Sequence, residues 1–264
     1  MSQFRVTTRQ TRAGKIAFYT AISALTPNLP VVVFLHGALR NASVLAPWGD
    51  LLAGVAEVVI LELPGHGRSE PIASATVQAM AEAIHEALAD AFSDRRVLLV
   101  GESLGGTIAL AIGGIADPAW LRAVFAADPP VTTAKLWSVD NNFRRLLERE
   151  PNHPFAARLG RDAFGISADD IEEIIYYPLI GALRVPTLIA TGDVRLLPPR
   201  RLKGVTCLFD AVDRFVVERL YPDRARVHQI ANCGHLLLVE AEAECLALIK
   251  STLAEHVDVV SGLP

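Results

Sequence analysis

The sequence predicts an α/β fold: a mostly parallel eight-stranded sheet with helices on both faces and a small helical lid. Short apolar, β-branched runs recur along the chain, segments with helical spacing separate them, and one long charged segment interrupts this rhythm. The chain has 264 residues, of which 51% are apolar and 20% charged. These values suit one large domain, which buries about three quarters of the surface of its unfolded chain.

The predicted strands are of two kinds. Residues 4–8 and 16–20 are typical of an opening antiparallel hairpin. The later strands read as continuous apolar runs, as expected where a parallel sheet is buried on both faces. These six runs are residues 31–35, 57–61, 97–100, 123–126, 187–190 and 226–230.

The segments between the strands carry the spacing of amphipathic helices. Met80, Ile84 and Leu88 fall on one helical face, and Leu104 and Ile108 share another. Because strands and helices alternate, we expect parallel strands joined by crossover helices.

Residues 131–181 break this alternation. The segment is richer in charge, contains no convincing strand, and is too long for a plain loop. We therefore predict a helical lid at 131–181, inserted after the sixth strand, and a core formed by residues 1–130 and 182–264.

Composition excludes several classes of partner. The net charge of −4 comes with no basic stripe, so nucleic acid is not expected. No apolar stretch is long enough to span a bilayer, and residues 1–10 lack the apolar core of a secretory signal. The three cysteines, without metal-like spacing, indicate reduced thiols. We expect a cytoplasmic protein without membrane, metal or cofactor; the sequence leaves the oligomeric state open.

Four polar motifs follow strand ends, where ligands bind in open α/β sheets. They are His36-Gly37, Pro64-Gly65-His66-Gly67-Arg68-Ser69, Gly101-Glu102-Ser103-Leu104-Gly105 and Gly234-His235.

The motif at 101–105 lies between a strand and a helix. Its glycines permit a sharp turn, which points the Ser103 hydroxyl out of the sheet. The helix begins at once, so the Leu104 N–H is available to an anion. One short turn thus offers a nucleophile and half of an oxyanion site. The alternative is a serine that only caps the helix.

Together, the HG, PGHGRS, GESLG and GH motifs resemble those of the α/β-hydrolase family, in the family's order, from Val31 to about Leu253. The resemblance implies Ser103 as nucleophile and His235 as its base. It also supplies the Ala38 N–H as the second oxyanion donor. It implies structural roles for His36 and His66.

The carboxylate that orients the histidine is ambiguous. The family commonly places it after the strand at 187–190, as Gly-x-x-Asp, but this chain carries Arg195 at that position. Asp193 fits if the loop is one residue shorter, and it is our first candidate. Asp128, after the sixth strand, is the alternative; Asp210 and Asp213 read as residues that enter a helix.

The sequence thus predicts a serine hydrolase, carboxylesterase-like, that cleaves a carboxylic ester or thioester of a small molecule through an acyl-enzyme. The apolar substrate pocket is expected at Leu39, Trp137, Phe143 and Leu147, although helix packing explains the lid residues equally well. One alternative keeps the triad for carbon–carbon bond hydrolysis, a lyase reaction or cofactor-free perhydrolysis. The other is a non-catalytic binding protein on a hydrolase scaffold.

Overall fold

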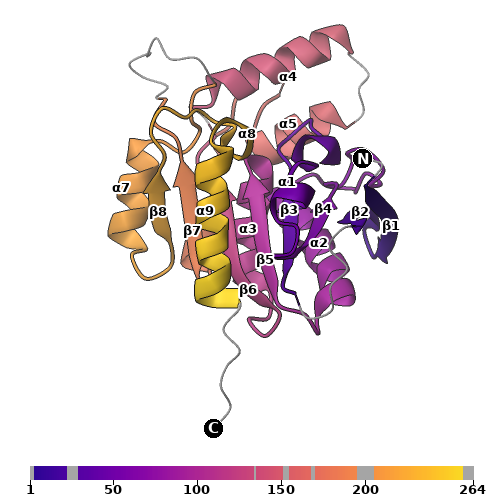
Figure 1. Cartoon of the computed structure of the whole chain (residues 1–264). Helices are drawn as coiled ribbons and strands as arrows, with labels where there is room; N and C mark the ends of the chain where they lie inside the picture. Colours follow the sequence, from indigo (N-terminus) through magenta and orange to yellow (C-terminus); the bar gives the residue numbers. More distant parts are fainter. Residues whose placement is uncertain are drawn as a thin grey trace.

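A computed structural model describes residues 3–22, 29–133, 135–150, 155–167, 170–194 and 205–257, apart from the side chains of Trp137 and Ser138. Eight strands form one sheet in the order β1-β2-β4-β3-β5-β6-β7-β8 (Figure 1). The pairs β1–β2 and β2–β4 are antiparallel, and the other pairs are parallel. The predicted fold class is confirmed. The strands are β1 (Phe4–Thr11), β2 (Gly14–Ala21), β3 (Val31–Leu35), β4 (Glu57–Leu61), β5 (Val97–Glu102), β6 (Leu121–Ala127), β7 (Thr187–Thr191) and β8 (Arg226–Gln229).

Helices cover both faces of this sheet (Figure 1). The described helices are η2 (Ala42–Leu45), α1 (Trp48–Leu51), α2 (Val77–Phe92), α3 (Leu104–Ile115), α4 (Trp137–Arg149), α5 (Ala156–Phe164), α6 (Tyr177–Gly181), α7 (Ala211–Leu220), α8 (Leu237–Glu240), α9 (Glu242–Thr252) and η3 (Leu253–Val257).

The core consists of two apolar layers, one on each face of the sheet. In β3, Val31, Val33 and Leu35 join the layer under α2 and α3. Val32 and Phe34 join the opposite layer, under α1, α8 and α9. Successive strand side chains point to opposite faces, so a strand buried on both faces must be apolar throughout, which is the pattern seen in the sequence.

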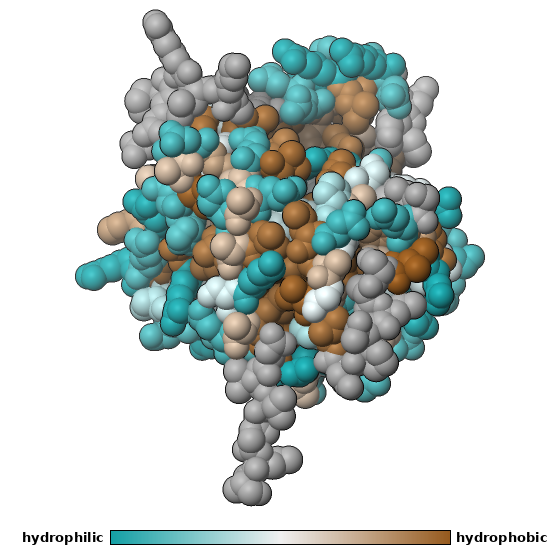
Figure 2. Space-filling model, in the orientation of Figure 1, coloured by the Kyte–Doolittle hydropathy of each residue, from teal (hydrophilic) through white to brown (hydrophobic). Residues whose placement is uncertain are grey.

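The segment between β6 and β7 carries α4, α5 and α6. Helices α4 and α5 stand over the upper end of the sheet (Figure 1). Hydrophilic residues cover the outer side of α4, and hydrophobic residues lie beneath it (Figure 2). The short α6 instead packs beside α3, where a Cβ on Gly114 would lie 3.2 Å from the Ala182 side chain. The division into core and lid stays a prediction.

Helix α5 is fastened to the loop after β4. Arg158 donates to the Ile72 carbonyl at 2.9 Å, and Asp162 accepts from the Ala75 N–H at 2.9 Å. The ring of Phe155 packs on the backbone of Gly65, where a Cβ would overlap it. These contacts hold α5 against the same sheet edge as the polar motifs.

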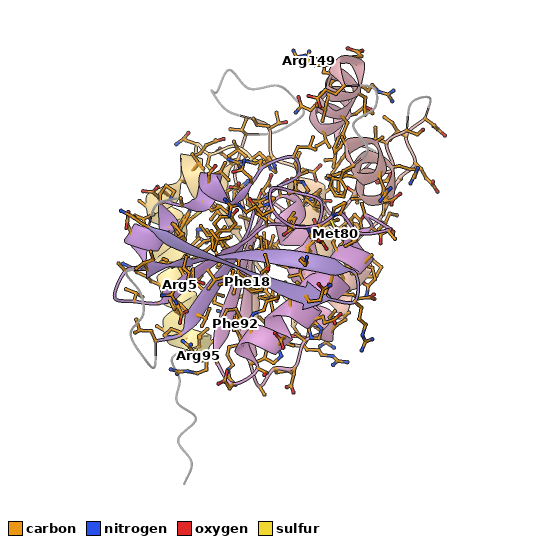
Figure 3. All side chains as sticks on the ribbon, turned by 90° about the vertical axis from the view of Figure 1, so that its right-hand side faces the viewer. Arg5, Phe18, Met80, Phe92, Arg95 and Arg149 are labelled. Carbon is orange, nitrogen blue, oxygen red and sulfur yellow. The ribbon has the colours of Figure 1, made fainter. Side chains whose placement is uncertain are left out.

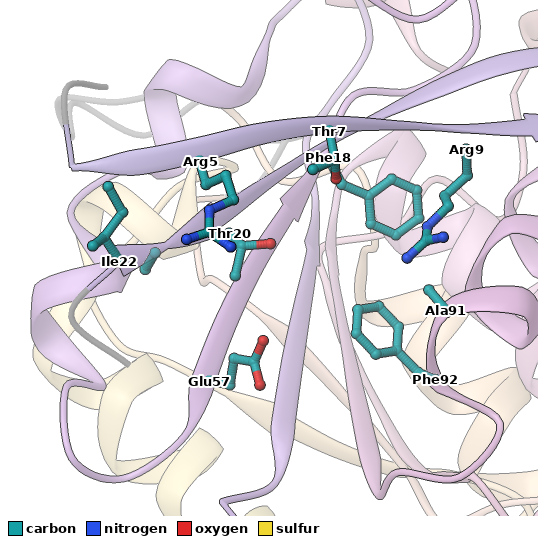
Figure 4. Close-up of a pocket in the computed structure, with 10 residues that line it drawn as sticks. Arg5, Thr7, Arg9, Phe18, Thr20, Ile22, Glu57, Ala91 and Phe92 are labelled. Carbon is teal, nitrogen blue, oxygen red and sulfur yellow. The ribbon is translucent and has the colours of Figure 1, made fainter. Parts of the chain in front are cut away.

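A surface cavity of about 210 Å³ lies at the opening hairpin (Figure 4). Phe18 and Phe92 meet there at 6.2 Å between ring centroids (Figure 3), and Arg5 and Arg9 of β1 line the same cavity. No histidine, cysteine or serine is among the described residues that line it. The four polar motifs singled out in the sequence lie elsewhere, at the carboxyl ends of the strands.

Candidate active site

Ser103 occupies a strained turn between β5 and α3. Its φ of 57° and ψ of −125° lie outside the regions that L-residues favour. A Cβ on Gly101 or Gly105 would overlap neighbouring backbone carbonyls, so both flanks require glycine. The Ser103 hydroxyl makes no capping hydrogen bond to α3. Helix capping therefore does not explain this serine.

The loop after β3 lies against this serine. A Cβ on Gly37 would come 3.6 Å from the Ser103 hydroxyl oxygen. Gly37 therefore lies directly against Ser103, and Ala38 is the next residue in this loop. On the other side of Ser103, Leu104 is the first residue of α3. These are the segments that the sequence predicted for the two oxyanion donors.

Two neutral histidines brace this loop from below. His36 is fully buried; its Nδ1–H donates to the Gly37 carbonyl at 2.8 Å, and its Nε2 accepts from the Leu63 N–H at 3.2 Å. Burial lowers the pKa of His36 to about 3. The Nε2 of His66 accepts from the Leu39 N–H at 3.0 Å. This bond holds Leu39 in its left-handed conformation, with a φ of 56°.

The base candidate, His235, contacts Asp128. Its Nδ1 lies 2.6 Å from Asp128 Oδ2, and the Asp128 side chain is fully buried. Three further donors reach the carboxylate: the Thr191 hydroxyl at 2.8 Å, the Leu208 N–H at 2.7 Å and the Phe209 N–H at 3.2 Å. These donors, together with His235, fix the orientation of the buried carboxylate.

The partner of His235 Nδ1 is thus the alternative candidate for the acid, Asp128, and not our first candidate, Asp193. The strand order explains this. β6 lies between β5 and β7, and the Ser103 N–H donates to the Ala127 carbonyl at 2.9 Å. Asp128 is thus the residue that follows Ala127, the backbone hydrogen-bond partner of Ser103. Asp193 instead follows β7, and its N–H donates to the Cys233 carbonyl at 2.9 Å.

The two remaining aspartates belong to a helix start, as the sequence predicted. Asp210 caps α7, accepting from the N–H groups of Val212 and Asp213, and the Asp213 side chain accepts from the Asp210 N–H. Lys135 bridges both carboxylates at 2.9 and 2.5 Å. Both carboxylates therefore bind Lys135 and backbone N–H groups at the start of α7.

The charges around His235 favour its protonated form. Burial lowers the pKa of His235, but the hydrogen bond and charge of Asp128, together with the charge of Glu102, outweigh it and raise the pKa above its ordinary value. An imidazole held by a carboxylate in this way both accepts a proton and tolerates the charge it gains.

The cysteines offer no second nucleophile. All three are free and buried. Burial raises the pKa of Cys207 and of Cys233 to about 12, which keeps both as thiols. Within the described ranges, no group of histidine, cysteine and acidic side chains is arranged to hold a metal ion.

The predicted apolar pocket is only partly described. Leu39 is 38% exposed beside the oxyanion loop, and Leu147 is half-buried on α4. Phe143 is packed between helices, with its ring 5.4 Å from that of Phe164. The side chain of Trp137 lies outside the described part of the chain. No described helix is both long and apolar enough to cross a membrane.

Comparison with known proteins identifies the family to which this fold belongs. A model of the alpha/beta hydrolase family matches residues 32–248. The chain belongs to this family, which supports a hydrolase function.

A curated relative is the dihydrolipoyllysine-residue acetyltransferase component of the acetoin cleaving system of Cupriavidus necator. It is 26% identical over 235 residues, which cover 84% of this chain and 63% of the relative. The chain thus spans less than two thirds of that relative's length.

Solved structures share the fold at low identity. E-2-(acetamidomethylene)succinate hydrolase has a TM-score of 0.70 at 19% identity, covering 95% of this chain and 99% of that one. A thermophilic esterase from Thermogutta terrifontis has a TM-score of 0.65 at 19% identity, covering 95% and 98%. The thioesterase domain of the curacin biosynthetic pathway has a TM-score of 0.63 at 20% identity, covering 93% and 98%.

Proposed function

We propose that this protein is a serine hydrolase that cleaves a carboxylic ester or thioester through an acyl-enzyme intermediate. The observation that carries the proposal is the buried 2.6 Å contact between Asp128 and His235, beside the strained Ser103 turn. A serine hydroxyl is a weak nucleophile until a base removes its proton. In the proposed roles, Ser103 attacks, His235 is the base, and Asp128 fixes the tautomer of His235.

The reaction proceeds by two acyl transfers. The Ser103 oxygen forms a bond to the substrate carbonyl carbon while its proton passes to His235. His235 then gives this proton to the leaving alcohol or thiol as the bond to the leaving group breaks. A water molecule, deprotonated by His235, attacks the acyl-enzyme carbonyl carbon. As the bond to the Ser103 oxygen breaks, His235 returns this proton to that oxygen, and the carboxylic acid leaves.

Charge on the carbonyl oxygen needs two convergent donors. The proposal assigns this role to the N–H groups of Ala38 and Leu104. The hydrogen bond from Leu39 to His66 and the buried His36 support it, because they fix the loop that presents Ala38.

We propose a small-molecule substrate with a modest apolar acyl part. Leu39 and Leu147 remain candidates for its pocket, together with Trp137. The packing of Phe143 against Phe164 favours a supporting role for Phe143, one step removed from the substrate. The three free thiols also suit our proposed location, the reducing cytoplasm.

A fluorophosphonate probe and a series of p-nitrophenyl esters of graded chain length test this function. The intact protein should become labelled at Ser103 and hydrolyse the shorter esters. Ser103→Ala should abolish labelling and lower kcat by about 10⁶-fold. If the wild-type protein is neither labelled nor active, the proposed hydrolase function is wrong, and a non-catalytic binding protein is the remaining alternative.

A further inference from the structure

Glu102 is a fully buried carboxylate directly before Ser103, and acyl transfer as described above does not use it. Each of its two carboxylate oxygens accepts a hydrogen bond. Oε2 accepts from Arg40 Nη1 at 2.6 Å, and Oε1 accepts from the Leu238 N–H at 3.0 Å. One side chain therefore links three segments that are far apart in the sequence.

Each of these three segments carries a part of the proposed site. Glu102 ends β5 and precedes the nucleophile. Arg40 follows Ala38 by two residues, and its Cδ lies 3.7 Å from where a Cβ on Gly37 would lie. Leu238 is the second residue of α8 and follows His235 by three residues.

Fold stability alone is a poor account of this pair. Burying a carboxylate costs several kcal/mol in desolvation, which an ion pair seldom more than offsets, and apolar replacements are often neutral or stabilising. The Arg40 side chain is also 24% exposed, so the pair lies at the border of the site and not deep in the core.

We propose that Glu102 and Arg40 form a positioning pair that fixes the oxyanion loop and the His235 loop relative to Ser103, with the Glu102 charge acting on His235. This inference rests on the proposed function. Both residues act through other groups and neither needs to touch the substrate.

The charged groups around His235 set the sign of the expected effect. Asp128 acts on it from the end of β6, Glu102 from β5 and Arg40 from the loop after β3. Glu240 on α8 accepts from the N–H of Gly234, the residue before His235, at 2.8 Å. A negative Glu102 favours the imidazolium. Removing its charge should therefore lower the pKa of His235.

Glu102→Gln tests the proposal, because glutamine keeps the acceptor for Leu238 and loses the charge. The matched control is Glu57→Gln, which removes the charge from the 3.0 Å ion pair with Arg95, at the opposite end of the parallel strands from Glu102. We expect Glu102→Gln to lower kcat at least about tenfold, as small misplacements do. We also expect the midpoint of the acidic limb of the pH profile of kcat/KM to decrease by about one pH unit. Glu57→Gln should change only thermal stability.

Arg40 variants test the pair from its other side. Arg40→Lys should retain most activity, Arg40→Met should lose about as much kcat as Glu102→Gln, and the double variant Arg40→Met/Glu102→Gln should lose no more than the worse single one. If Glu102→Gln fails to fold, the kcat of Arg40→Lys compared with that of Arg40→Met tests the proposal instead. Wild-type kcat in Arg40→Met would overturn the proposal.

A histidine titration by NMR separates this inference from the proposed function, because it requires no activity. If the wild type hydrolyses no ester but Glu102→Gln still lowers the pKa of His235, the substrate assignment fails and the charge coupling stands. If the pKa of His235 and kcat match the wild type, and only stability falls as in Glu57→Gln, then the pair is merely structural.

Discussion

The Nδ1 atom of His235 lies 2.6 Å from Oδ2 of Asp128. This contact links the carboxyl end of β6 to the loop that follows β8. Asp128 has a φ of 45°, in the left-handed region that aspartate tolerates better than most residues. Its N–H donates to the Ala190 carbonyl at 2.7 Å. The backbone of the acid is thus fixed as firmly as its side chain.

The pH dependence of activity follows from this pair. A base must be neutral to accept the Ser103 proton, and the pKa of His235 is raised above its ordinary value of 6.5. We therefore expect kcat/KM for a p-nitrophenyl ester to increase with pH through a midpoint above 6.5. The corresponding midpoint in Asp128→Asn should be lower, because the largest contribution that raises the pKa is gone. Equal midpoints in the two proteins would contradict the assignment.

The same raised pKa has a consequence for stability. A histidine whose pKa is higher in the folded than in the unfolded state stabilises the fold fully below its unfolded value of 6.5. This contribution is lost as the pH increases through the folded pKa.

His36 predicts the opposite trend at acidic pH. Its folded pKa is lowered to about 3, so only the unfolded chain gains a proton between pH 6.5 and 3. Its contribution to stability is therefore complete above pH 6.5 and is lost as the pH falls, by about 1.4 kcal/mol per unit. Urea unfolding at several pH values should show a shallower decline between pH 6 and 4 for His36→Asn than for the wild type. Parallel curves would mean that His36 is not buried in its neutral form.

The oxyanion loop predicts a kinetic role for His66. His66→Ala removes the acceptor of the Leu39 N–H, and losing a hydrogen bond of this kind costs about 0.5–1.5 kcal/mol. We expect a decrease of about tenfold in kcat for a p-nitrophenyl ester, with a smaller change in KM, since the loop presents a donor used in the transition state.

His85 provides the control for that experiment. It is half-buried on α2, with its ring 5.9 Å from that of Trp120, which precedes the amino end of β6 and so lies away from the carboxyl strand ends. His85→Ala should lower stability and leave kcat unchanged. An equal decrease of kcat in both variants would mean that His66 acts only through general stability.

The sequence predicted the fold well because the fold depends on local patterns. The apolar run 31–35 became a strand whose alternate residues join different core layers. The serine turn was recognisable because its flanking glycines are a requirement of the local backbone.

The acid was not predictable in the same way. Asp128 is selected by N–H donors from Leu208 and Phe209, eighty residues further along the chain, and by a left-handed backbone that no local pattern reveals. The Asp-Pro-Pro sequence around it reads as an ordinary turn. The ion pair of Glu102 with Arg40 also depends on two loops meeting in space, which spacing alone does not indicate.

The most direct test compares kcat for p-nitrophenyl acetate in Asp128→Asn and Asp193→Asn, with folding checked by thermal unfolding. We expect Asp128→Asn to lower kcat by about 10⁴-fold, as the loss of a triad carboxylate does. We expect Asp193→Asn to stay close to the wild-type value. Loss of activity in Asp193→Asn alone would show that Asp128 is not the carboxylate that orients His235.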